Sequence, residues 1–244
     1  MEVIQEKVAI VIPTLNEAEN IPQLVERLRN ALETLTLNYE LIVVDDDSTD
    51  GTADVVQALS AEDPRIRLLV RKGQRGLAGA VIYGWKHTDA AFLGVIDADL
   101  QHPPEILPQL LEAVQSGKDI AIASRYTSGN HDSVADWNPV RAFISRCTTA
   151  LTTPLQRKGL RVKDPMSGYF IVRRECIEGL NLQPQGFKIL LEILVKGRMR
   201  NAAEVPYRFG LRNAGNSKAD FKVALDYLSL LGKLSRYAVF RPQQ

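Results

Sequence analysis

The stretch Val8-Ala9-Ile10-Val11-Ile12-Pro13 decides the fold class, because it is a short apolar run that a proline ends. Apolar side chains at every position are typical of a strand that is buried on both faces of a parallel sheet. Apolar residues then recur at helical spacing from Ile21 to Leu35, and Pro22 is acceptable in the first turn of a helix. The beginning of the chain therefore predicts one strand followed by one helix.

The same alternation of strand and helix continues through the first half of the chain. We expect further strands at residues 40–44, 66–70, 92–96 and 120–123. We expect further helices at residues 52–59, 77–86 and 105–115. Repeated strand and helix units pack as a parallel sheet with helices on both faces. The sequence therefore predicts an α/β fold with a mainly parallel sheet flanked by helices.

The pattern changes after Ser124. Residues 125–137 are polar and lack periodicity, which predicts a loop. Beyond this loop the sequence predicts two helices, at residues 140–155 and 186–196, and two strands, at residues 169–172 and 203–207. These elements are too few to form a second core, so we predict one domain over residues 1–220 and a C-terminal segment over residues 221–244.

The C-terminal segment is predicted to form an amphipathic helix over residues 221–240. Its polar residues fall three or four apart and form one stripe, which consists of Lys222, Asp226, Ser229, Lys233 and Arg236. Apolar residues cover the rest of the helix. Two interpretations stay open, and both can hold: the helix packs on the domain, or it lies in a membrane interface or against a partner protein.

The composition excludes several classes of protein. A chain of 244 residues with 45% hydrophobic residues has enough apolar side chains for a sizeable core, which excludes disorder. Cys147 and Cys176 stand far apart, so neither a disulfide framework nor a zinc site is expected. The N-terminus is too charged for a signal peptide, and no window reaches the roughly 18 apolar residues of a spanning helix. We expect a cytoplasmic protein, soluble or peripheral on the cytoplasmic face of a membrane.

Charge is distributed unevenly along the chain, although the formal net charge is only +1. Residues 1–124 contain 10 Lys and Arg against 20 Asp and Glu, and residues 125–244 contain 20 against 9, so the halves carry −10 and +11. Either the solvated surface is uneven, or the first half holds a cation and the second half meets an anion such as a phosphate or an acidic membrane. Nucleic acid is not expected as a partner, because the basic residues are not interleaved with aromatic ones.

Acidic residues follow two of the predicted strands. Asp45-Asp46-Asp47 comes after the second strand and Asp97-Ala98-Asp99 after the fourth. The carboxyl ends of parallel strands meet at one edge of a sheet and form its ligand crevice, so we expect these carboxylates close together. Strand alternation places Asp97 and Asp99 on one side, and Gln101 can add a neutral oxygen. Such oxygen ligands suit Mg²⁺ or Mn²⁺.

Other residues of these loops have simpler interpretations. Asp50 precedes Gly51 and a helix, so we predict a turn and N-cap there, which leaves Asp46 and Asp47 for a ligand. The glycines before the third helix are not spaced as in a dinucleotide motif, and nothing supports NAD. They predict a loop that approaches a sugar or nucleotide: Gly73, Gly76 and Gly79.

Three segments of the first half together resemble the GT-A glycosyltransferases of family 2. They are Ile12-Pro13-Thr14-Leu15-Asn16-Glu17, Val44-Asp45-Asp46-Asp47-Ser48-Thr49-Asp50-Gly51-Thr52 and Asp97-Ala98-Asp99-Leu100-Gln101-His102-Pro103. The second half resembles the polyprenol-phosphate (dolichol-phosphate) mannosyltransferases in five segments. They are Ser124-Arg125-Tyr126, Trp137-Asn138 to Arg141, Ser145-Arg146, Asp164-Pro165-Met166-Ser167-Gly168-Tyr169-Phe170, and Arg212 to Ser217-Lys218. The resemblance implies a Rossmann-like GT-A fold and an inverting transfer of mannose from GDP-mannose to a polyprenyl (dolichyl) phosphate.

Carried over position by position, the resemblance implies roles for individual residues. The guanine nucleotide would lie against Pro13, Leu15, Glu17, Val44 and Asp46, and Ala98 and Leu100 would also belong to the donor site. Mg²⁺ or Mn²⁺ would bind Asp97, Asp99 and Gln101. The donor's phosphates would meet Arg212 and Lys218, and the acceptor phosphate would meet Arg125, Arg141 and Ser145. The expected catalytic residues are Asp99, Arg125 and Arg141.

The chemistry of a lipid phosphate acceptor agrees with an acidic first half and a basic second half of the chain. The phosphate is already ionised at neutral pH, so it needs no strong general base, but it does need positioning. The attacking and leaving phosphates repel each other near one anomeric carbon, and a basic half opposite a metal-bearing half offsets that repulsion. Many bacterial members of the family continue into transmembrane helices, and the sequence predicts none here. We therefore expect membrane docking through residues 221–240, a partner protein or shorter acceptors.

Three alternatives stay open. The donor could be of the UDP-glucose type, since Leu15 stands where the family often has Tyr and Gln185 where some members have Lys. A haloacid-type phosphatase also begins with Asp-x-Asp, but it requires Thr or Val where this chain has Gln101. A non-catalytic nucleotide-sugar-binding subunit is the third alternative, and the intact metal and arginine residues argue against it.

Overall fold

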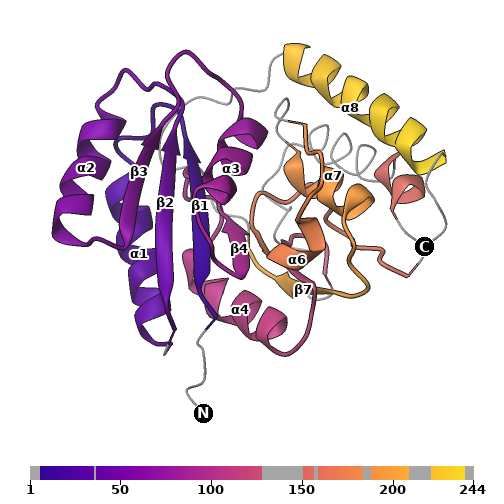
Figure 1. Cartoon of the computed structure of the whole chain (residues 1–244), viewed down its shortest axis with the longest axis horizontal. Helices are drawn as coiled ribbons and strands as arrows, with labels where there is room; N and C mark the ends of the chain where they lie inside the picture. The colour runs from indigo at the N-terminus through magenta and orange to yellow at the C-terminus, as the bar shows by residue number, and fades with distance from the viewer. Residues whose placement is uncertain are drawn as a thin grey trace.

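A computed structural model describes residues 6–35, 37–127, 151–156, 159–183, 188–208 and 221–239, the last range with side chains only at 229–238. Its strands are β1 (Val8–Thr14), β2 (Tyr39–Asp45), β3 (Ile66–Val70), β4 (Phe92–Val95), β5 (Ile120–Ser124), β6 (Phe170–Arg173) and β7 (Ala202–Pro206). Its helices are α1 (Ile21–Glu33), α2 (Thr52–Glu62), α3 (Leu77–Lys86), α4 (Leu107–Gln115), α6 (Arg174–Ile177), α7 (Ile189–Lys196) and α8 (Phe221–Val239). The described strands form one sheet in the order β3-β2-β1-β4-β6-β5-β7 (Figure 1). The predicted α/β fold with a mainly parallel sheet is confirmed.

Among the described strands, β6 is antiparallel to both of its neighbours, β4 and β5, whereas the other pairs are parallel. An apolar run fits either direction, so the sequence predicts a strand at 169–172 without its direction. The insertion of β6 has a consequence for the site. Asp97, after β4, and Arg125, after β5, reach the same edge of the sheet on either side of β6.

Hydrophobic cores on both faces of the sheet explain the fully apolar sequence of β1. Val8, Ile10 and Ile12 pack in one core with α1, α2 and α4. Ala9 and Val11 pack in the other core with α3, α6 and α7. The sheet is therefore the middle layer of three, with helices on both of its faces (Figure 1).

Helix boundaries differ from the sequence predictions where prolines intervene. The helix expected at 105–115 begins with the 3-10 turn η1 (Pro104–Ile106), and α4 follows with Pro108 in its first turn. A proline is tolerated there because the first N–H groups of a helix have no partner within it. The helix expected at 140–155 is described only from residue 151, where it leads into the 3-10 turn η3 (Thr153–Leu155). Four residues are too few for helical periodicity, so the sequence gives no sign of α6.

The C-terminal half of α8 packs against the domain. Leu230 and Leu234 are buried in a cluster with Leu191 and Val195 of α7 and with Leu155 of η3. The interpretation of the C-terminal helix as one that packs on the domain therefore holds for this half. Whether the helix also meets a membrane or a partner stays a prediction.

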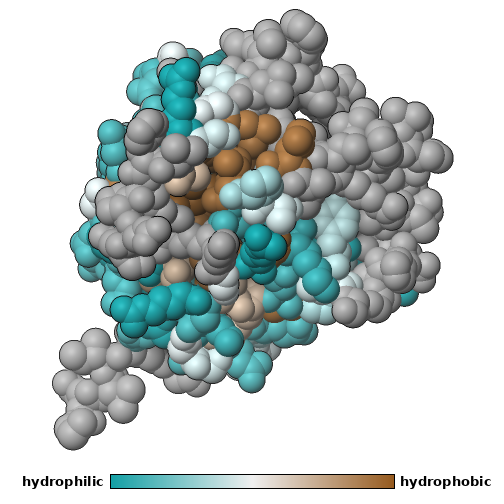
Figure 2. All heavy atoms as spheres, turned by 90° about the vertical axis from the view of Figure 1, so that its right-hand side faces the viewer, coloured by the Kyte–Doolittle hydropathy of each residue, from teal (hydrophilic) through white to brown (hydrophobic). Residues whose placement is uncertain are grey.

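Exposed side chains of α8 and of the segment before η3 include both apolar and basic ones. Figure 2 views the molecule from the side that lies to the right in Figure 1, and apolar atoms gather there next to hydrophilic ones. Lys233, Arg236 and Tyr237 of α8 are exposed, and so is Leu151, which leads into η3. Over the described ranges, no helix is long and apolar enough to cross a membrane.

Candidate active site

The predicted site residues that the structure describes lie at the carboxyl edge of the sheet. In the register of β1 and β2, Pro13 lies beside Val44 and Thr14 beside Asp45. The chain leaves β4 toward Asp97 at the same edge, because β1 and β4 are parallel. The sheet thus brings together loops that are far apart in the sequence, as expected for an open α/β fold.

Hydrogen bonds tie the loop after β1 to the loop after β2. Asn16, with φ of 57°, donates its backbone N–H to Ser48 Oγ over 2.8 Å. Its side-chain oxygen accepts the N–H of Thr49 over 2.9 Å. Ser48 Oγ donates in turn to Asp45 Oδ1. These bonds fix the turn that carries Leu15, one of the residues expected near the nucleotide.

Asp50 has a structural role, as predicted, but it is not the N-cap of α2. Its carboxylate accepts the N–H of Thr52 and that of Ala18, each over 3.0 Å. Thr52 Oγ1 accepts the N–H of Glu17, also over 3.0 Å. The N-cap residue of α2 is Gly51, so Asp50 acts from one position before the cap. It connects the start of α2 with the segment that carries Glu17.

Asp46 is buried and holds the neighbouring loop. Its carboxylate accepts bonds of 2.7 and 3.1 Å from the Arg71 guanidinium and a bond of 2.8 Å from the N–H of Gly76. Arg75 donates to the backbone carbonyls of Asp46 and Asp47. The sequence assigns Asp46 to a ligand, and the structure adds that its carboxylate fixes the loop of residues 71–76.

Asp97, Asp99 and Gln101 lie in a tight turn after β4. The backbone N–H of Gln101 donates to Asp99 Oδ1 over 3.2 Å, and Leu100 adopts a left-handed φ of 60° while its side chain is buried. Gly168, just before β6, leaves room for Asp97, because a β-carbon at that position would lie 2.6 Å from Asp97 Cγ. The turn is therefore shaped around the Asp97 carboxylate.

These three residues fit a divalent cation of the Mg²⁺ or Mn²⁺ type. Carboxylate and amide oxygens are hard ligands, and a cation of this type fills its remaining positions with water and phosphate oxygens. The described residues contain no group of three or more His, Cys, Asp and Glu side chains arranged around a metal position. The resemblance implies the Gln101 amide as the third protein ligand beside the two aspartates.

Arg125 forms a bidentate ion pair with Asp164, a residue for which the sequence predicts no role in the site. Nε and Nη2 of Arg125 each donate over 2.7 Å to one oxygen of Asp164. Burial alone lowers the pKa of Arg125, but the bonds to Asp164 outweigh burial and the net shift is upward. Local sequence patterns do not connect two residues 39 positions apart.

Lys188 is a second cationic side chain, besides Arg125, and the sequence does not predict its role. Its Nζ donates to the carbonyl of Met166 over 3.3 Å. Burial and the positive charge of Arg125 lower its pKa to about 8, while the negative charges of Asp97 and Asp164 act in the opposite direction. Lys188 thus shares the electrostatic environment of both the cation ligands and Arg125. The available signal is a lysine directly before the mainly apolar run 189–195, which only Glu192 interrupts.

The ring of His102 packs against two tyrosines. Its ring centroid lies 6.0 Å from that of Tyr169 and 5.4 Å from that of Tyr207. Burial lowers the pKa of His102 to about 4, so the ring is neutral near pH 7. A packed, neutral histidine directly after Gln101 holds the turn of the predicted cation ligands.

Several predicted positions lie outside the described residues: Arg141, Ser145, Gln185, Arg212 and Lys218. The structure accordingly places Arg125 but not the other residues expected on the donor and acceptor phosphates. Their roles stay predictions.

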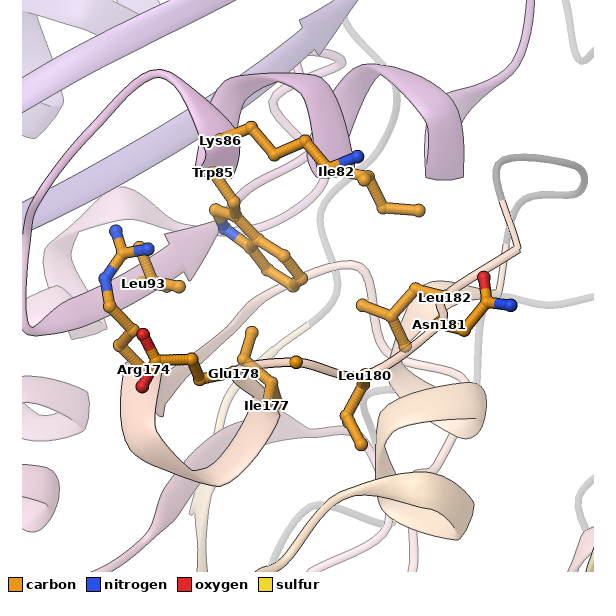
Figure 3. A pocket seen from close by; sticks show the side chains of 11 residues that line it. Ile82, Trp85, Lys86, Leu93, Arg174, Ile177, Glu178, Leu180, Asn181 and Leu182 are labelled. Carbon is orange, nitrogen blue, oxygen red and sulfur yellow. The ribbon is translucent and has the colours of Figure 1, made fainter.

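A separate cavity of about 230 Å³ lies between α3 and the segment after α6. Apolar side chains converge on it from both sides: Ile82, Trp85, Leu93, Ile177, Leu180 and Leu182 (Figure 3). Lys86, Arg174 and Glu178 also line it. None of the predicted site residues takes part, so this cavity is distinct from the carboxyl edge of the sheet.

Comparison with known proteins identifies the family of the chain. The model of glycosyl transferase family 2 matches residues 9–180. A dolichol-phosphate mannosyltransferase of Pyrococcus furiosus is 44% identical over 231 residues, which cover 95% of this chain and 64% of that protein. The chain thus spans less than two thirds of the length of this relative. Proteins of the same name from Mycosarcoma maydis and Saccharomyces cerevisiae are 38% and 35% identical and are covered over 79% and 86% of their lengths.

Solved structures with a similar fold include two sugar-phosphoglycerate synthases. A mannosyl-3-phosphoglycerate synthase from Rubrobacter xylanophilus has a TM-score of 0.66 at 19% identity, over 98% of this chain and 76% of that one. A glucosyl-3-phosphoglycerate synthase from Mycobacterium tuberculosis, in complex with Mn²⁺ and UDP-glucose, has a TM-score of 0.64 at 20% identity, over 98% and 81%. Identities this low indicate a shared fold, here GT-A. The family match over residues 9–180 and the curated relatives show that the chain belongs to glycosyl transferase family 2.

Proposed function

We propose that this glycosyltransferase moves a mannosyl group from GDP-mannose to a polyprenyl (dolichyl) phosphate, with inversion and with the aid of Mg²⁺ or Mn²⁺. One observation carries the proposal: Asp97 and Asp99 lie at the same sheet edge as the Arg125 guanidinium. Carboxylates suit a cation on a leaving diphosphate, whereas a guanidinium suits a second phosphate that attacks. The curated relatives named above support this choice of substrates.

On the donor side, the nucleotide is proposed to bind the loops after β1 and β2. Pro13 and Val44 are neighbours there, and Asp46, which is paired with Arg71, would supply one wall. Asp97, Asp99 and Gln101 would hold the cation, which when bound offsets the charge of the departing nucleoside diphosphate. The remaining donor contacts are assigned to Glu17, Leu15, Ala98, Leu100, Arg212 and Lys218.

On the acceptor side, Arg125 is proposed to bind the lipid phosphate, together with Arg141 and Ser145. The phosphate is ionised before it arrives, so these residues orient it toward the anomeric carbon and do not need to remove a proton. Lys188 adds positive charge next to Arg125 and Asp97. Two phosphates can therefore approach one carbon with less mutual repulsion.

The acceptor is a lipid, so the protein is proposed to work at a membrane surface, peripherally and on its cytoplasmic side. The exposed Lys233, Arg236 and Tyr237 of α8 suit anionic head groups and the interfacial layer. A membrane-anchoring partner protein is the other proposed route to the same surface.

Nucleotide binding tests the donor assignment, and UDP-glucose is the competing donor, as in the Mycobacterium tuberculosis neighbour. Calorimetry with Mn²⁺ present should show GDP binding at least about tenfold more tightly than UDP, because a pocket built for one base leaves polar groups unpaired with another. Tighter binding of UDP would overturn GDP-mannose as the donor. Nucleotide binding without any sugar transfer would favour a non-catalytic subunit.

A further inference from the structure

Arg125 is held by a carboxylate that a substrate cannot reach. Besides the two side-chain bonds, the backbone N–H of Arg125 donates to Asp164 Oδ2 over 3.0 Å. The Asp164 side chain is 0% exposed, whereas that of Arg125 is 12% exposed. Arg125 can therefore meet a ligand, while Asp164 acts only through Arg125.

Asp164 is itself fixed to the sheet. The two backbone N–H groups of Lys163 and Asp164 donate to the two oxygens of Glu204, over 3.0 and 3.1 Å. Glu204 lies on β7 opposite Ile122 of β5, three residues before Arg125. Both partners of the ion pair are thus anchored to the same two paired strands.

The geometry of the ion pair with Asp164 determines how the Arg125 guanidinium is oriented toward a ligand. A guanidinium carries five N–H donors in one plane, and the bonds from Nε and Nη2 to Asp164 fix that plane. A free arginine side chain loses rotamer entropy when it binds a phosphate. Arg125 has already been ordered by Asp164, so binding no longer carries that cost.

We infer that Asp164 is the positioning residue for Arg125, which it orients toward the acceptor phosphate, and that Glu204 fixes the turn that carries Asp164. The inference rests on the proposed function, which assigns the acceptor phosphate to Arg125. Asp164 takes no proton in the reaction and touches neither substrate.

A double-mutant cycle on the folded full chain tests this inference. Arg125→Ala should lower kcat/KM for dolichyl phosphate by about tenfold or more and leave the dissociation constant of GDP-mannose nearly unchanged. Asp164→Asn keeps the shape of the side chain but removes its negative charge, and it should also lower kcat/KM for dolichyl phosphate and leave GDP-mannose binding nearly unchanged. The double variant should be no worse than Arg125→Ala alone, since Asp164 has nothing left to position.

The matched control is Glu40→Gln. Glu40 is another buried carboxylate, paired with Arg67 and Lys7 near the start of β2, at the opposite end of that strand from Asp45. Its loss should lower stability and leave kcat/KM for the lipid phosphate unchanged. If circular dichroism shows that Asp164→Asn does not fold, Glu204→Gln replaces it in the cycle, because an amide nitrogen cannot accept one of the two backbone bonds.

The outcomes separate the two hypotheses. If Arg125→Ala leaves kcat/KM for the acceptor unchanged, the proposed role of Arg125 is wrong. If Arg125→Ala lowers kcat/KM but Asp164→Asn, or its replacement Glu204→Gln, does not, only the positioning inference fails. Multiplying effects in the double variant would also overturn the inference, because they would mean that Asp164 acts independently of Arg125.

Discussion

Gly168 lies directly against Asp97: a β-carbon at position 168 would be 2.6 Å from Cγ of the Asp97 carboxyl group and 2.9 Å from its Oδ1. Gly168 precedes β6, and Asp97 follows β4, so the contact exists because β6 is paired with β4. An otherwise ordinary methyl group at position 168 would therefore displace one of the predicted cation ligands.

Gly168→Ala should abolish most Mn²⁺ binding and sugar transfer, because the Asp97 carboxylate must rotate away. Overpacking of this kind costs about 1–3 kcal/mol of unfolding free energy, which a folded domain can tolerate. Calorimetry with Mn²⁺ and urea unfolding measure the two effects. The control is Gly232→Ala in α8, where a β-carbon meets nothing within 4 Å. Normal Mn²⁺ affinity in Gly168→Ala would contradict the assignment of Asp97.

Asp99→Asn should reduce sugar transfer by roughly 100-fold or more, because it removes one negative charge from the cation ligands. The fold should persist, since the substitution leaves no cavity. Turnover and circular dichroism check the two expectations. Treatment with EDTA should stop the wild-type enzyme, and Mg²⁺ or Mn²⁺ should restore it. A fully active Asp99→Asn variant would exclude Asp99 as a ligand.

His102 should make the protein less stable in acid. Its pKa falls from 6.5 when exposed to about 4 in the fold, so below pH 6.5 the unfolded chain takes up a proton that the folded chain does not. The free energy of unfolding should decrease as the pH falls from 6.5 to about 4, and the contribution of His102 should then level off. His102→Gln lacks this proton uptake. Urea unfolding between pH 4 and 7.5 should show a shallower slope for the variant, and equal slopes would mean that His102 is not buried as described.

The exposed face of α8 should bind anionic vesicles. Lys233→Glu combined with Arg236→Glu should weaken flotation with vesicles that contain phosphatidylserine, since each basic residue near such a surface contributes about 1 kcal/mol. The contrasting variant, Leu234→Ala, removes a buried contact with α7 and should lower stability by about 2–5 kcal/mol without changing flotation of the folded protein. Equal flotation of the charge-reversed and wild-type proteins would leave α8 with its packing role alone.

The sequence predicts features that depend on local periodicity and fails on those that depend on long-range pairing. The fully apolar β1 indicates a strand buried on two faces, and Asp97-Ala98-Asp99 after an apolar run indicates oxygen ligands at a sheet edge. The direction of β6 leaves no local trace. The pair of Asp46 with Arg71 and the pair of Arg125 with Asp164 join residues 25 and 39 positions apart. Such pairs are set by the packing of the sheet, so the sequence shows the charged residues but not their partners.

Transfer of label from donor to lipid tests the proposed activity most directly. The full chain is incubated with GDP-mannose labelled in the sugar, dolichyl phosphate and Mn²⁺, and the organic phase is then extracted and counted. Label should enter the organic phase only when the acceptor and the cation are both present, and labelled UDP-glucose should give none. Transfer from UDP-glucose but not from GDP-mannose, or no transfer from either donor by the folded protein, would contradict the proposed function.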